Sequence, residues 1–255
     1  MDPTLLQFII LCPLTLIAGY IDAVAGGGGL ISLPAYLLVG LPAHNAIATN
    51  KLSSSFGTVF ATLRYGRQGY IKKKLALICV PAALLGSWCG ARLSLLVPEH
   101  IFRLLLVLIL PMVAWNVLRK KTYDDGLPLE ELPWKTTALR CALISLVVGG
   151  YDGFYGPGTG TFLMLLLSGA AGLNLTTCAG TTKIINLSSN LCALFTFMTG
   201  GHVVFALGLA GAVCSAVGNW LGAVSFGKKG AGLLRPLIIL VLGLLFVKTV
   251  WELFA

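Results

Sequence analysis

Two glycine-broken motifs place an acid, a run of glycines and a lysine inside otherwise apolar sequence. The first begins at Asp22, continues through the glycines of 26–29 and is followed by Lys51. The second begins at Asp152 and is followed, after its own glycines, by Lys183. Ionisable and helix-breaking residues are costly in a membrane interior. Their recurrence in both halves therefore indicates a binding site built from a duplicated unit, as in secondary transporters.

The composition predicts an integral membrane protein. Of 255 residues, 57% are hydrophobic and only 11% are charged, whereas about a quarter of a soluble chain is charged. The net charge of +9 comes from short basic loops beside apolar spans, which is an orientation signal and not a nucleic-acid site. The seven cysteines lack metal-ligand spacing, and no nucleophile–base pairing is visible. We therefore expect no metal, no cofactor and no enzyme activity.

The chain contains an internal duplication. An offset of 132 residues relates Lys51 to Lys183 and relates the Gly-Ser-Trp-Cys-Gly-Ala stretch of 86–91 to Gly-Asn-Trp-Leu-Gly-Ala at 218–223. The two motif aspartates are offset by 130 residues. We interpret residues 1–118 and 135–255 as two repeats of one transmembrane domain, joined by a linker at 119–134.

Each repeat is predicted to be all-α, with about five helical pieces. The second piece of each has only about 11 or 12 residues, too short to span a core of roughly 30 Å, so we expect a broken or re-entrant helix at each glycine run. The expected pieces are 5–24, 28–40, 45–65, 73–96, 100–118, 135–151, 160–171, 176–199, 203–226 and 232–254.

The distribution of basic residues predicts inverted repeats. The loop after the third piece of the first half holds Arg64, Arg67 and the lysines of 72–74, so it should be cytoplasmic. Its counterpart, 200–202, has no lysine or arginine, while Lys228 and Lys229 follow the next piece. An inversion requires an odd number of net crossings per half. Both termini should then be extracytoplasmic and the linker cytoplasmic, in a multi-pass protein of the bacterial inner (plasma) membrane.

The two lysines each head a polar stripe at helical spacing, which in lipid should face the protein interior or a water-filled cavity. The alternative is that the lysines extend to the membrane interface and the hydroxyls bond their own helix backbone. The candidate substrate-binding residues of these segments are Asn50, Lys51, Ser54, Ser55, Thr58, Lys183, Asn186, Ser189 and Asn190.

The glycine runs let the backbone approach a ligand closely, and a half-helix that starts there presents free N–H groups and a positive dipole end. With two lysines, this predicts a donor-rich site for a small oxyanion near the bilayer midplane; close helix packing without a ligand is the alternative. The candidates are Gly26, Gly27, Gly28, Gly29, Gly156, Gly158 and Gly160. Asp22 and Asp152 either carry a coupling proton or pair with a lysine or cap a half-helix.

The glycine-rich stretch 22–34, the Gly-Leu-Pro of 40–42 and the Thr-Asn-Lys segment of 49–57 together resemble the sulfite exporter TauE/SafE family of bacterial membrane permeases. The likeness covers nearly the whole chain. It implies a transporter of sulfite or organosulfonate-type anions, and export as the direction. The second half differs in having Thr182 where Asn50 stands and Pro157 within its glycine run.

We therefore expect a secondary transporter that moves a small anion across the bilayer by alternating access. An anion channel would share the pocket but keep an open path, and a membrane scaffold would not transport at all. The partners expected are a small anionic substrate and the lipid bilayer, without nucleic acid.

Overall fold

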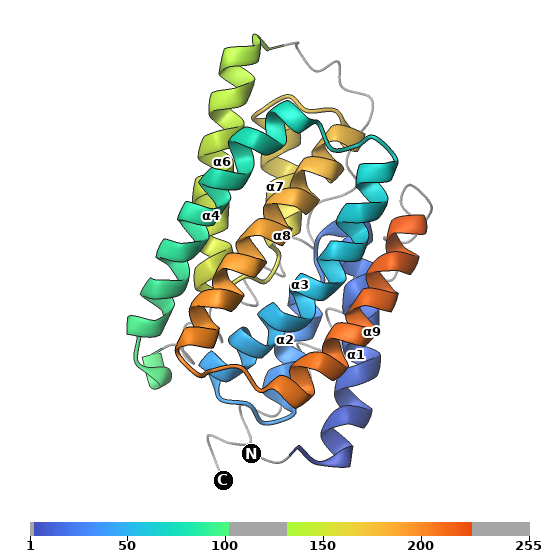
Figure 1. Cartoon of the computed structure of the whole chain (residues 1–255), viewed down its shortest axis with the longest axis vertical. Helices are drawn as coiled ribbons and strands as arrows, with labels where there is room; N and C mark the ends of the chain where they lie inside the picture. Colours follow the sequence, from blue (N-terminus) through green and yellow to red (C-terminus); the bar gives the residue numbers. More distant parts are fainter. Residues whose placement is uncertain (1–2, 102–131, 226–255) are drawn as a thin grey trace.

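The computed structural model describes residues 3–101 and 132–225. Within these ranges every regular element is a helix, as the composition predicts (Figure 1). In chain order they are α1 (Leu5–Ala25), α2 (Gly29–Leu38), α3 (Ala43–Arg67), α4 (Lys73–Leu96), α6 (Trp134–Phe154), α7 (Thr159–Gly169), α8 (Leu175–Thr199) and α9 (Phe205–Val224).

Helices α1 and α2 form a re-entrant hairpin. Helix α1 ends at Gly26, whose φ of 71° lies in the left-handed region that glycine adopts without strain. Helix α2 has only 10 residues, and at its end the carbonyl of Val39 accepts a hydrogen bond of 2.7 Å from Gln7 Nε2, in the first turns of α1. The chain therefore returns to the end of the bundle from which α1 started.

Helices α6 and α7 repeat this arrangement from the opposite end of the bundle (Figure 1). Gly158, with φ 81°, precedes the 11-residue helix α7. Arg140 Nη1, near the start of α6, donates to the carbonyl of Ala170, just after α7, at 2.6 Å. The two short pieces predicted from the sequence are thus both present as half-helices that do not cross the bundle.

The two halves of the chain are interlocked: α1 packs most extensively against α9, and α4 against α6. Glycines make both contacts close. A Cβ on Gly86 would lie 2.1 Å from the carbonyl oxygen of Leu146, and a Cβ on Gly218 would lie 2.0 Å from that of Leu16. Small residues allow this approach in membrane bundles. The duplicated Gly-x-Trp-x-Gly-Ala stretch is therefore a packing element, repeated once in each interface.

The outer surface of the bundle is apolar. Large hydrophobic side chains such as Leu77, Val147 and Phe195 are mostly exposed, as expected where lipid replaces water. Among the described residues, α1, α4 and α9 are long and apolar enough to cross a membrane, which matches three predicted spans. Two of the ten predicted pieces, 100–118 and 232–254, lie outside the described residues apart from positions 100 and 101.

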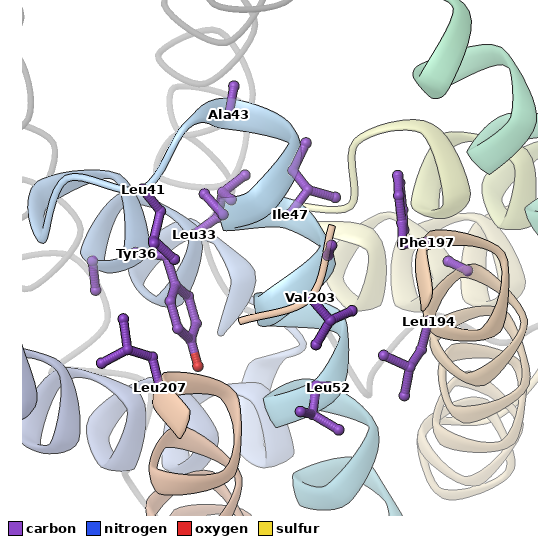
Figure 2. Packing of buried hydrophobic residues seen from close by; sticks show 14 of the residues in the cluster. Leu33, Tyr36, Leu41, Ala43, Ile47, Leu52, Leu194, Phe197, Val203 and Leu207 are labelled. Atoms are coloured by element: carbon purple, nitrogen blue, oxygen red, sulfur yellow. The ribbon is translucent and has the colours of Figure 1, made fainter. Parts of the chain in front are cut away.

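Two apolar clusters fill opposite ends of the bundle. The Tyr36 cluster joins α2, the start of α3, the end of α8 and the start of α9, and includes Leu33, Ile47, Phe197 and Leu207 (Figure 2). The Tyr65 cluster joins the end of α3 to the starts of α4 and α8 and to α7, and includes Leu75, Leu163, Leu167 and Ile185. Between them lies the polar centre of the protein.

Candidate functional site

The two glycine breaks meet backbone to backbone. A Cβ on Gly26 would lie 2.3 Å from the carbonyl carbon of Gly160, and a Cβ on Gly160 would lie 2.5 Å from the Cα of Gly26. In the first turn of α7, Thr161 donates its backbone N–H to the carbonyl of Gly26 at 3.2 Å and its hydroxyl to that of Ala25 at 2.9 Å. The end of α1 is thereby held against the start of α7.

Lys51 of the first half pairs with Asp152 of the second. Its Nζ lies 2.9 Å from Asp152 Oδ1 and donates to Asn190 Oδ1 at 3.0 Å. Both ion-pair partners are only 2% exposed, so removing either would leave an uncompensated buried charge. Asn190 is oriented in turn by its amide N–H group, which donates to Asn186 Oδ1 at 2.7 Å.

Lys183 of the second half pairs with Asp22 of the first. Its Nζ lies 2.8 Å from Asp22 Oδ2 and also donates to the backbone carbonyl of Asp22. That carbonyl belongs to the last turn of α1, where a cation is stabilised by the helix dipole. Each lysine therefore reaches across to the aspartate of the other half, and neither pairs with the aspartate of its own motif.

A polar cavity of about 30 Å³ lies at this centre. That is room for a few water molecules, since a cavity of roughly 150 Å³ is what holds a benzene ring. Fourteen of the predicted site residues line it, and these are Asp22, Gly26, Gly28, Gly29, Asn50, Lys51, Ser54, Thr58, Asp152, Gly156, Gly158, Gly160, Asn186 and Asn190.

Four predicted site residues do not line the cavity: Gly27, Ser55, Lys183 and Ser189. Lys183 and Ser189 still act on its walls, because Lys183 binds Asp22 and the Ser189 hydroxyl donates to Asp152 Oδ2. Ser55 is buried, and its hydroxyl has no hydrogen-bond partner. Each lysine charge is thus paired with a carboxylate. The hydrogen-bond donors left for a ligand in the cavity are therefore amides, hydroxyls and half-helix N-termini more than free cations.

Sequence reasoning missed one wall of the cavity, which α9 supplies through Ser215 and Asn219. Asn219 is 1% exposed; its amide nitrogen donates to the Ser215 carbonyl at 3.1 Å, while its Oδ1 has no hydrogen-bond partner. The sequence does contain a signal for this wall, because these two polar residues lie one helical turn apart in an otherwise apolar span. The other lining residues not predicted are Thr15, Ala18, Gly19, Ser32, Ser53 and Thr159.

A separate titratable cluster lies at one end of the bundle, where His44 in the first turn of α3 meets Glu99 and His202. Glu99 follows α4 and accepts hydrogen bonds from the backbone N–H of Ala43 at 2.5 Å and from His44 Nδ1 at 2.6 Å. Burial would raise the pKa of the Glu99 carboxyl, but these hydrogen bonds outweigh burial and lower it. In the loop before α9, burial and the neighbouring His44 lower the pKa of His202.

Comparisons with known proteins place the chain among membrane transporters. The family model described as Sulfite exporter TauE/SafE matches residues 11–249. The chain is 33% identical over 225 residues to "Probable membrane transporter protein ORF9" of Sinorhizobium sp, covering 88% of this chain and 85% of the relative. It is 31% identical over 240 residues to "Probable membrane transporter protein YfcA" of Escherichia coli K12, covering 93% and 87%.

A third relative, a "Probable membrane transporter protein" of Haemophilus influenzae, is 32% identical over 236 residues, covering 92% of this chain and 91% of the relative. No solved structure matches the chain. The apolar helices, the duplicated glycine-broken motifs and a family match over nearly the full length all lead to the same assignment. The chain belongs to the sulfite exporter TauE/SafE family and is a multi-pass membrane transporter.

Proposed function

We propose that this protein is a secondary transporter that exports a small oxyanion, such as sulfite or an organosulfonate, by alternating access. The observation that carries the proposal is the pair of reciprocal ion pairs, Lys51 with Asp152 and Lys183 with Asp22, at the junction of two half-helices. Costly buried charges of this kind mark substrate pathways in membrane proteins.

The geometry of the cavity favours a small anion as substrate. Helices α2 and α7 start at the cavity, so the positive ends of two helix dipoles meet there. Asn50, Asn186 and Asn190 add amide groups, and Ser54 and Thr58 add hydroxyls. Binding to Lys51 or Lys183 would require the anion to share or displace the paired carboxylate. The sulfur-containing substrate class and export rest on the family name alone.

The small size of the cavity supports alternating access over an open channel. A volume of about 30 Å³ is too small for a sulfonate, and the Tyr36 and Tyr65 clusters pack the bundle on either side. Binding of such a substrate therefore requires the cavity to widen. The α1–α2 and α6–α7 hairpins start from opposite ends of the bundle (Figure 1), which supports the inverted repeats that such a cycle uses.

The proposal is tested by uptake into proteoliposomes, with radiolabelled sulfite, sulfoacetate, sulfate and thiosulfate offered separately. We expect saturable uptake and counterflow of at least one anion, with the rate lowered at least tenfold by Lys51→Ala. The control is Lys135→Ala, which removes an exposed lysine at the start of α6 and should transport as the wild type does. Unsaturable flux with single-channel currents would show a channel instead, and no flux of any of these anions would remove the sulfur-anion substrate.

A further inference from the structure

The two buried ion pairs have unequal surroundings. Asp152 accepts three side-chain hydrogen bonds, from Lys51 Nζ, from Thr159 Oγ1 at 2.8 Å and from Ser189 Oγ. Among the described residues, the Asp22 carboxylate has Lys183 as its one side-chain donor. Both aspartates line the cavity, but the Asp22 side chain is 15% exposed, against 2% for Asp152.

The sequence explains this difference. When the repeats are aligned, the positions that correspond to Thr159 and Ser189 are Gly29 and Gly57, which have no side chain to donate. Both positions leave little room for a side chain. A Cβ on Gly57 would lie 2.2 Å from Ser215 Oγ, and a Cβ on Gly29 would lie 3.1 Å from Pro157 Cα. Asp22 therefore lacks the counterparts of the two hydroxyls that donate to Asp152.

The charges of the described core cancel before any substrate enters. Lys51 and Lys183 balance Asp22 and Asp152, so a bound anion adds a negative charge that no further ionised side chain there compensates, in a medium where an unpaired charge is costly. A proton on Asp22 would restore neutrality. It would also free the Lys183 ammonium to bind the anion, whereas protonation of Asp152 would disrupt three hydrogen bonds.

We propose that Asp22 takes up one proton together with each monovalent anion, while Asp152 stays ionised, so that transport is electroneutral. This coupling rests on the proposed anion transport. The proton comes from water on the side to which the cavity opens, forms an O–H bond with the Asp22 carboxylate, and is released on the other side with the anion. Lys183 keeps its own proton throughout. Its partner changes from the Asp22 carboxylate to the bound anion.

The groups around Asp22 are compatible with this role. From α8 it faces Lys183, and from α3 the groups nearby are Lys51, in the same cavity wall, and Tyr65, whose hydroxyl donates to the carbonyl of Ala23 at 2.8 Å. Helices α2, α7 and α9, which also pack near α1, carry no Asp, Glu, Lys, Arg or His. Among the described residues, the one other carboxylate at the cavity is therefore Asp152, which is paired with Lys51.

The site of protonation is tested without any transport, by labelling the purified protein with dicyclohexylcarbodiimide, which reacts with protonated carboxyl groups in apolar surroundings. We expect mass spectrometry to find the adduct on Asp22, increasing as the pH is lowered from 8 to 5, and at least tenfold less on Asp152. Asp22→Asn should abolish that adduct and Asp22→Glu should keep it. The double variant Thr159→Val with Ser189→Ala should make Asp152 reactive. Equal labelling of both aspartates, or of neither, would overturn the inference.

The coupling is tested in proteoliposomes that contain a pH-sensitive dye, with an inward gradient of isethionate, a monovalent sulfonate. We expect the interior to acidify as isethionate enters, and Asp22→Asn to lower this acidification at least tenfold. Isethionate entry that generates a membrane potential without acidification would overturn the proton coupling and leave the transporter intact. Selective labelling of Asp22 without isethionate transport would instead count against the substrate class and leave the proton site standing.

Discussion

Gly26 and Gly160, which belong to different halves of the chain, lie backbone against backbone at the centre of the protein. A Cβ on either residue would approach main-chain atoms of the other to 2.5 Å or less. Backbone cannot move aside as a flexible side chain can, so this contact fixes both residues as glycine and fixes the distance between the two half-helices.

Gly26→Ala and Gly160→Ala should therefore destabilise the protein by roughly 2 kcal/mol or more, from overpacking and, at Gly26, from the left-handed φ of 71°. Thermal unfolding in detergent measures this. The matched control is Gly169→Ala, because Gly169 ends α7 with nothing within 4 Å of an added Cβ. A melting temperature lowered as much by the control as by Gly26→Ala would contradict the close contact.

Replacing Lys51 and Asp152 together should destabilise the protein less than replacing Lys51 alone. Lys51→Met leaves the Asp152 carboxylate unpaired at 2% exposure, which should cost about 3–5 kcal/mol of stability. In the double variant Lys51→Met with Asp152→Leu no buried charge is left alone, so much of that loss should be recovered. Transport should be absent from both. A stable double variant that still transports would show that the pair serves structure only.

Substitutions at two asparagines should affect anion binding and stability separately. Asn219 lines the cavity with a buried Oδ1 that has no partner, so Asn219→Ala should raise the KM for the anion about tenfold, which corresponds to about 1.4 kcal/mol. Asn174 caps α8 by accepting from the Thr177 N–H at 2.9 Å, so Asn174→Ala should lower stability by about 1 kcal/mol with the KM unchanged. The reverse pattern of KM and melting temperature would refute the assignment of Asn219 to the site.

The proposed orientation is measurable by cysteine labelling in a variant without native cysteines. Gln68, in the basic loop after α3, and Thr199, at the end of α8, are both exposed and lie at opposite ends of the bundle (Figure 1). We expect Thr199→Cys to react in intact cells with a thiol reagent that cannot cross the membrane, and Gln68→Cys to react after lysis alone. Labelling of Gln68→Cys from outside would reverse the orientation.

Acid should destabilise the cluster of Glu99, His44 and His202. Because the pKa of His202 is lowered in the folded state, the unfolded chain binds a proton first, and stability falls as the pH drops below about 6.5. The lowered pKa of Glu99 gives stability that is present above about pH 4.3 and is lost as the pH falls further.

Melting temperatures measured between pH 8 and 3 check this. His202→Gln should reduce the slope between pH 7 and 5, and Glu99→Gln should reduce it below pH 5. His100→Gln, at an exposed position beside Glu99, is the control and should follow the wild type. Equal slopes in all four proteins would exclude the cluster as a source of pH dependence.

The sequence was sufficient to predict the helices and most of the cavity wall, because hydropathy and broken glycine motifs are local signals. The apolar piece at 28–40, for example, is too short to span and so predicts a half-helix, and α2 has 10 residues. The partner of each lysine could not be predicted. Asp22 is nearer to Lys51 along the chain, yet it pairs with Lys183, since pairing depends on how interlocked helices approach. Asn219 was missed because an amide beside glycines and Trp220 also fits a packing role.

The interlocking of the halves has a consequence for how the protein is made. Asp22 is synthesised 161 residues ahead of its partner Lys183. Helix α1 is likewise made long before α9, the helix against which it packs most. During synthesis the first hairpin therefore holds an unpaired carboxylate and an uncovered glycine break in lipid. A chain truncated before α8 would lack Lys183 and would leave the Asp22 carboxylate without its ion-pair partner.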